Sequence, residues 1–173
     1  GRSGARALGD GTPISLAEIR EQATKSGFGS RLLAVVADTE SGRLYISPSA
    51  IQERAASIGS DQIEAPDALL PEKALGFRVF AYGYRRWAEL FSPRQLLTMT
   101  TFSEIVSEVR EQVLRDAITA GVEDGPSLSD GGVGASAYAD QVAIYLALAV
   151  SRLADYSSNI STWNIPGEKM RNV

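Results

Sequence analysis

The sequence contains neither cysteine nor histidine among its 173 residues. The absence of cysteine excludes disulfides, thiol nucleophiles and thiolate metal sites. The absence of histidine excludes Ser-His-Asp and Cys-His triads and every imidazole-bound metal. Within this chain, only carboxylate chemistry or a metal held by oxygen ligands stays open.

Long hydrophobic runs and a strong excess of one charge are also missing. The longest apolar run, 142–150, is far shorter than the about 20 residues that span a bilayer. Residues 1–4 have no apolar run behind them, so no signal peptide is indicated. The net charge is 17 − 21 = −4, which argues against a generally basic nucleic-acid coat but not against a local basic patch. We expect a cytoplasmic protein with no membrane partner, and a piece of a longer chain.

The composition is that of a globular protein, with 44% hydrophobic and 22% charged residues. Residues 1–12 are polar and rich in glycine, which predicts a disordered linker. Residues 13–173 have the length of one domain, or of a part-domain in a longer protein. The glycine cluster at 131–134 follows no predicted strand, so we interpret it as a flexible connection rather than a phosphate-binding loop.

Two short helices are predicted in the first third of the chain. Ser15 and Glu18 fit a capping box, which begins a helix that ends near residue 25. Pro48 suits an early helical position and predicts a second helix that ends near residue 57.

Strand patterns lie between and after these helices. The apolar segment 31–37 and the segment 43–46 flank turn residues, which predicts a β-hairpin. The first strand is apolar throughout, so we expect it to be covered on both faces. Segment 77–82 alternates weakly and is predicted as a third strand.

Two long helices dominate the second half. The first is predicted from Pro93 to about residue 120, with Ser92 as its N-cap and Gly121 just after its end. The second is predicted over 135–157 and is apolar nearly all round, with Tyr138, Val142, Tyr145, Ala149, Leu153 and Tyr156 on one side. The expected fold is α+β and mainly α. The two long helices pack as a hairpin, and a small β element lies near the N-terminal side.

Two stretches mix aromatic and basic residues. Composition alone favours placing the aromatic side chains of 82–87 in the core, with the arginines in water above them. Arg94 lies at a predicted helix N-terminus, where backbone N–H groups favour an anion. Stretch 163–172 is open to two interpretations, a contact with a polyanion or an exposed connection.

Four blocks of the sequence carry a resemblance to a bacterial family. They are GSRLLAVVA (29–37) with GRLYISP (42–48), YG (82–83) with WAELFSPRQLLTMTTFS (87–103), YADQVAIYLA (138–147) with RLAD (152–155), and STW (161–163) with EKMRN (168–172). They resemble large adenine-specific DNA methylases with an N-terminal domain of unknown function and a zinc ribbon, some of them linked to restriction–modification and phage defence. The resemblance covers about 13–173, and LFSPRQL is its most specific part.

The resemblance implies that this chain is the middle of such an enzyme. In the family, the cofactor-binding glycine loop and the zinc ribbon lie before this region, and an Asp-Pro-Pro-Tyr motif lies after it. Neither the glycine loop nor that tetrapeptide occurs here, so no catalytic residue and no cofactor site is assigned to this chain. The implied parent reaction transfers a methyl group from S-adenosylmethionine to the exocyclic amine of adenine in DNA. The implied partners are DNA and the remainder of the methylase.

The same resemblance leads to a set of candidate DNA contacts. They are Arg85, Arg86, Arg94, Lys169 and Arg171 for phosphates, with Trp163 and Trp87 as the aromatic candidates, although Trp87 still fits a core position. The alternative is a non-catalytic helical interaction module that makes no DNA contact. The apolar second long helix fits both hypotheses equally, and the net charge of −4 favours this alternative.

Overall fold

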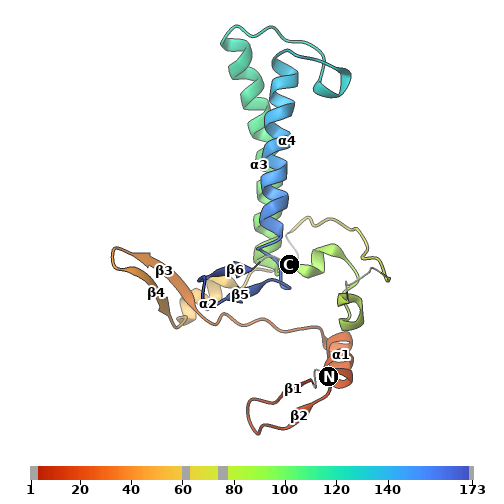
Figure 1. The fold of residues 1–173 in the computed structure, drawn as a ribbon, viewed down its shortest axis with the longest axis vertical. Coiled ribbons are helices and arrows are strands. Elements are labelled where there is room, and N and C mark those ends of the chain that lie inside the picture. The colour runs from red at the N-terminus through yellow and green to blue at the C-terminus, as the bar shows by residue number, and fades with distance from the viewer. Residues whose placement is uncertain (1–3, 60–62, 74–77, 172–173) are drawn as a thin grey trace. The chain divides into compact units, whose positions relative to one another are not determined.

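The computed structural model describes residues 4–59, 63–73 and 78–171, and its elements fall into two units (Figure 1). The first unit comprises Gly1–Ile58 with Pro66–Ser92, and the second comprises Gly59–Ala65 with Pro93–Val173. The first contains β1 (Ala5–Arg6), β2 (Pro13–Ile14), α1 (Leu16–Ser26), β3 (Val35–Thr39), β4 (Gly42–Ile46), α2 (Ala50–Ala56) and the short 3₁₀ helices η1 (Val79–Tyr82) and η2 (Trp87–Leu90). The second contains α3 (Pro93–Thr119), η3 (Leu128–Asp130), α4 (Ala135–Ala154), β5 (Thr162–Asn164) and β6 (Lys169–Arg171).

The expectation of a chain that mixes helices with small β elements is confirmed. In the described part, the strands form three separate two-stranded antiparallel sheets, β1 with β2, β3 with β4 and β5 with β6. The predicted linker, 1–12, contains strand β1, which pairs with β2 just beyond it. No helix among the described residues combines the length and the apolar content needed to cross a bilayer.

Serine side chains begin the two helices of the first unit. Ser15 Oγ accepts from the Glu18 amide at 3.2 Å, and Glu18 Oε2 accepts from the Ser15 amide at 2.7 Å, so the predicted capping box is confirmed. In α2 the N-cap is Ser49, which makes the same reciprocal pair of bonds with Gln52. Pro48 therefore precedes the cap. Its predicted place inside the first turn is wrong, because the serine at 49 supplies the stronger start signal.

The predicted β3–β4 hairpin forms, with Val36 paired to Tyr45 and Thr39 to Gly42. Its first strand begins at Val35 instead of residue 31, and it extends to Thr39 in the predicted turn. The side chains of the hairpin are not covered, however. Val36 and Leu44 remain about half exposed, and Leu33, just before β3, is 80% exposed. The prediction that the first strand is covered on both faces is therefore wrong for the described structure, because two strands alone cannot bury both of their own faces.

Residues 79–82 form the 3₁₀ helix η1 instead of the predicted third strand, and Phe77 lies outside the described residues. Gly83 follows with a φ of +91°, which turns the chain sharply. Tyr82 and Tyr84 then both reach Phe28, with ring centroids 6.3 and 6.0 Å away. The Arg20 guanidinium of α1 lies 5.2 Å from the Tyr82 ring centroid. These aromatic and cation–π contacts stabilise η1, so the weak alternation of apolar and polar residues in 77–82 does not lead to a strand.

Helices α3 and α4 lie side by side in the second unit (Figure 1). Helix α3 begins at Pro93 as predicted. Gly121 follows its end with a φ of +88° and donates to Ile118 O at 2.9 Å, while the Val122 amide donates to Ala117 O at 3.0 Å. These two bonds are the Schellman arrangement, so the predicted C-terminal glycine is confirmed.

Burial in α4 is concentrated in its first turns. Ala135, Ala137 and Ala139 are buried, while Tyr138 is 55% and Tyr145 is 74% exposed. Val142 and Leu153, on the same predicted side of the helix as the two tyrosines, are partly buried. Asp140 on α4 forms an ion pair with Arg110 on α3.

The contacts of Tyr82 and Tyr84 with Phe28 depend on the sharp turn of the chain at Gly83. A Cβ at this position would lie 3.1 Å from both Ala23 O and Thr24 Cα, and the left-handed φ disfavours any side chain. We expect Gly83→Ala to lower the free energy of unfolding by about 1–3 kcal/mol. Urea titration followed by tyrosine fluorescence would measure the change.

Gly29→Ala is the matched control, because a Cβ there meets no atom within 4 Å. Equal stability of the two variants would contradict the role assigned to Gly83.

Candidate nucleic-acid interface

The β5–β6 ribbon is attached to the end of α4 by a short bonded turn. Ser161 Oγ donates to Asp155 O at 2.9 Å, and the Ser161 amide donates to Ser158 O at 3.1 Å. The two serine hydroxyls are 3.0 Å apart, and Ser158 is buried. The root of the ribbon is therefore held by the helix that precedes it.

The strand register divides the candidate DNA contacts of the ribbon between two faces. Lys169 and Arg171 are two residues apart on β6, so their side chains lie on the same face, and both residues are exposed. Trp163 is paired with Met170, which places both on the opposite face. The sequence joins Trp163 with the two cations in one stretch, but the period of a strand separates them.

The tip of the ribbon is a four-residue turn, 165–168. The Glu168 amide donates to Ile165 O at 3.3 Å, and the Gly167 amide donates to the Asn164 side chain at 3.3 Å. Glu168 has a φ of +44°, the left-handed conformation that completes the turn. These bonds leave the Ile165 side chain 78% exposed at the tip.

Arg94 lies in the first turn of α3 and is exposed. Helices α3 and α4 run in opposite directions, with Arg110 of α3 opposite Asp140 of α4. The start of α3 therefore lies at the end of the unit where α4 finishes and the ribbon begins. Arg94, Lys169 and Arg171 share this end, although their sequence positions are far apart.

Arg85 and Arg86 belong to the first unit and make contacts within it. The Arg85 guanidinium lies 3.9 Å from the Phe80 ring centroid and donates to Phe80 O at 2.8 Å. Arg86 forms an ion pair with Asp67 and donates to its carbonyl. Trp87, next in the chain, is 44% exposed, so the core position favoured for it is wrong in the described structure. Arg85 and Arg86 thus belong to a different unit from Arg94, Lys169 and Arg171.

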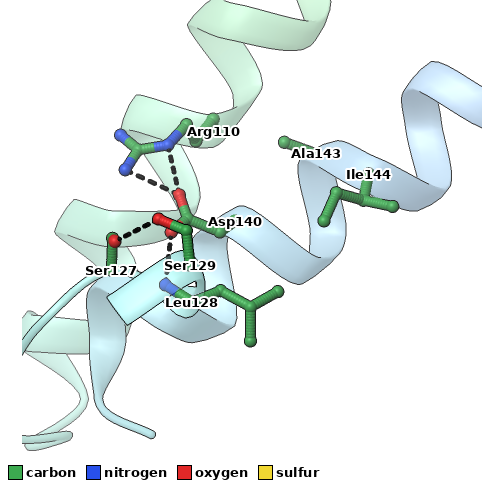
Figure 2. Close-up of a pocket in the computed structure, with 7 residues that line it drawn as sticks. All are labelled: Arg110, Ser127, Leu128, Ser129, Asp140, Ala143 and Ile144. Atoms are coloured by element: carbon green, nitrogen blue, oxygen red, sulfur yellow. Dashed lines mark hydrogen bonds and ion pairs between the residues drawn. The ribbon is translucent and has the colours of Figure 1, made fainter. Parts of the chain in front are cut away.

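In the half of the α3–α4 pair away from the ribbon, an ion pair joins the two helices (Figure 2). Arg110 contacts Asp140 Oδ1 through Nη2 at 2.7 Å and through Nε at 2.8 Å, and Leu128 N donates to the second carboxylate oxygen at 2.9 Å. The Leu128 amide, followed by the Arg110 guanidinium, holds the pKa of Asp140 below its usual value. A shallow pocket of about 530 Å³ opens beside this pair. Because the pair and its neighbour Glu111 satisfy one another, we interpret the network as structural.

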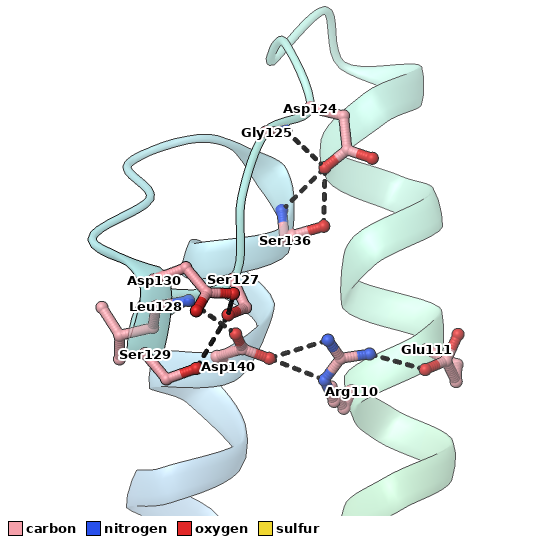
Figure 3. A network of polar contacts seen from close by, with 10 residues as sticks. All are labelled: Arg110, Glu111, Asp124, Gly125, Ser127, Leu128, Ser129, Asp130, Ser136 and Asp140. Atoms are coloured by element: carbon pink, nitrogen blue, oxygen red, sulfur yellow. Dashed lines mark hydrogen bonds and ion pairs between the residues drawn. The ribbon is translucent and has the colours of Figure 1, made fainter.

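A second aspartate holds the loop between the helices (Figure 3). Asp124 Oδ1 accepts from Ser136 Oγ at 2.6 Å and from the Ser136 amide at 3.2 Å, which caps the N-terminus of α4 from outside the helix. The hydrogen bond from the Ser136 hydroxyl, followed by one from the Gly125 amide, holds the pKa of Asp124 below its usual value. The backbone passes so closely that a Cβ at Gly132 would lie 1.8 Å from Pro126 O. The loop is therefore bonded and tightly packed, and its interpretation as a flexible connection is wrong.

Within residues 4–59, 63–73 and 78–171, no three carboxylates gather closely enough to hold a metal ion. The sequence does not reveal the role of Asp124, because its partner Ser136 lies twelve positions away. No protein-family model, curated protein or solved structure matches this chain.

The network at Asp140 predicts a pH-dependent stability. Because the folded-state pKa of Asp140 is lowered, its stabilising effect is complete above the usual value of 3.8 and is lost as the pH falls through the folded pKa. We expect Asp140→Asn to lower the Tm by about 2–4 °C near pH 7. The difference between variant and wild type should shrink below about pH 4. Thermal unfolding by circular dichroism at a series of pH values would test this.

Glu104→Gln, which neutralises an exposed carboxylate elsewhere on α3, serves as the control. A loss at Asp140→Asn that stays constant down to pH 2 would refute the electrostatic explanation.

Proposed function

We propose that this chain is the intervening, non-catalytic segment of an adenine-specific DNA methyltransferase, and that it supplies helical scaffold and DNA phosphate contacts. The observation that carries the proposal is the exposed basic face of the β5–β6 ribbon, with Lys169 and Arg171 side by side. This ribbon coincides with one of the four blocks that resemble the methylase family. The absence of cysteine and histidine agrees with a segment that leaves the chemistry to other parts of the enzyme.

In this proposal the chain positions DNA while the remainder of the methylase binds S-adenosylmethionine. Methylation of the adenine amine requires the base to leave the stack, which costs a few kcal/mol. Contacts between cationic side chains and phosphates help to offset that cost, and they fix where the duplex lies. The α3–α4 pair acts as a helical hairpin that carries the cationic end.

Arg94, Lys169 and Arg171 are the phosphate contacts that the geometry favours. They are exposed and lie at the same end of the second unit. The N–H groups at the start of α3 add partial positive charge beside Arg94. Arg85 and Arg86 instead stabilise the first unit, since their guanidinium groups bond to Phe80 and Asp67.

The methylase parentage is tested by reading the coding DNA outward from both ends of this segment. We expect a glycine-rich cofactor loop upstream and an Asp-Pro-Pro-Tyr motif downstream. If extended flanking sequence contained neither motif, the methyltransferase assignment would be overturned.

DNA contact is tested by fluorescence anisotropy with a labelled duplex over a range of salt concentrations. We expect the triple variant Arg94→Gln, Lys169→Gln, Arg171→Gln to reduce the slope of log K against log [salt] by about 2.7, as three lost phosphate contacts require. The matched control replaces Lys25, Arg54 and Arg115 by glutamine, which removes the same net charge from exposed helical positions. An unchanged slope in the triple variant, or equal losses in both variants, would rule out these contacts.

A second function is favoured by a different observation. Helix α4 exposes an apolar face on the side away from α3, made of Tyr138, Ile144, Tyr145 and Leu148. Such a face is typical of a helical interaction module that docks another protein without DNA. The salt titration separates the two functions, since apolar docking predicts no duplex binding in 50 mM salt and phosphate contact predicts strong binding there.

A further inference from the structure

The tip of the β5–β6 ribbon combines an exposed apolar side chain with neighbouring cations. Ile165 is 78% exposed, and Pro166 beside it is also exposed. Lys169 and Arg171 follow on the adjoining strand and share one face. An apolar group at the end of a basic ribbon is the pattern by which several DNA-bending proteins insert a wedge between base pairs.

The ribbon is held firmly enough for such a role. The turn is closed by the bond from the Glu168 amide to Ile165 O, and the Asn164 side chain accepts from Gly167. At the root, Ser161 is bonded to the end of α4 and contacts the buried Ser158. Because both ends of the ribbon are bonded, the cost of ordering Ile165 on binding is reduced.

We infer that the β5–β6 ribbon is an arm for double-stranded DNA whose tip, Ile165 with Pro166, inserts between two base pairs from the minor groove. Lys169 and Arg171 contact the phosphates along that groove. The inserted side chain unstacks the step and bends the duplex. This inference rests on the proposed DNA contact, and it gives the ribbon a task beyond holding phosphates, because a disturbed stack makes it easier to extract a base.

Duplex DNA fits the tip better than a protein or a lipid surface does. A protein-docking site requires a broad apolar patch, whereas Ile165 is followed by Pro166, Gly167 and the charged Glu168. The two cations on one face of the ribbon complement the negative charge of DNA phosphates, and they do not complement an apolar partner. The carboxylate of Glu168 opposes DNA at the tip, so Glu168→Gln should strengthen duplex binding about 2- to 5-fold.

The test uses the full chain and a duplex that carries 2-aminopurine at its centre and a fluorophore pair at its ends. We expect wild type to raise 2-aminopurine fluorescence, which reports unstacking, and to raise energy transfer, which reports bending. The double variant Ile165→Ser, Pro166→Ala should lose both signals and bind about 10-fold more weakly. Its salt slope should stay that of wild type, because the phosphate contacts remain.

Val133→Ser is the matched control. It removes another apolar side chain, 97% exposed, from the loop that joins α3 to α4. Equal Tm values for all variants would show that the changes act on binding and not on folding.

The outcomes separate this inference from the proposed function. If wild type binds no duplex at any salt concentration, the proposed DNA contact and the arm are both overturned. If duplex binding keeps its salt slope but the tip variant unstacks and bends DNA as wild type does, only the wedge is overturned. If the tip variant instead weakens binding to vesicles of anionic phosphatidylglycerol and leaves the duplex signals unchanged, the tip is a lipid contact and the inference is also overturned.

Discussion

The arrangement of the second unit depends on the ion pair between Arg110 and Asp140. A guanidinium and a carboxylate that face one another across two helices require full hydrogen bonding, and the Leu128 amide supplies the remaining partner at 2.9 Å. This three-way contact links α3, the inter-helical loop and α4. It therefore fixes which part of α4 lies opposite which part of α3.

The packing of α4 on α3 affects two candidate surfaces, the exposed apolar face of α4 and the cationic end of the unit. Ala135, Ala137 and Ala139 are buried in the first turns of α4, while Tyr145 and its apolar neighbours are exposed. Because Arg110 lies opposite Asp140, the end of α4 lies beside the start of α3. The ribbon is bonded to that end through Ser158 and Ser161, so Arg94 and the ribbon cations lie at one end of the unit. A structural pair far from the interface thus positions the residues proposed to contact DNA.

Several charged residues stabilise the fold through contacts within the chain. Asp124 caps α4, Asp140 joins two helices, and Glu18 caps α1. Arg85 and Arg86 bond to their own unit. This use of acids and bases fits a segment that positions a partner. It fits a scaffold in a DNA methylase and a protein-docking module equally well, and the exposed cations of the ribbon favour the former.

Local features were determined by the sequence itself. The capping box at Ser15, the start of α3 at Pro93 and the glycine end at Gly121 each depend on atoms within about five residues, so short patterns predict them correctly. Only the tertiary structure decided which face of α4 is buried, because that depends on a partner thirty positions away. The same holds for Trp163, since the face it occupies follows from its pairing with Met170 and not from its neighbours in the chain. Composition and spacing constrain what each segment can form, whereas contacts between distant residues select which of its surfaces remain available for function.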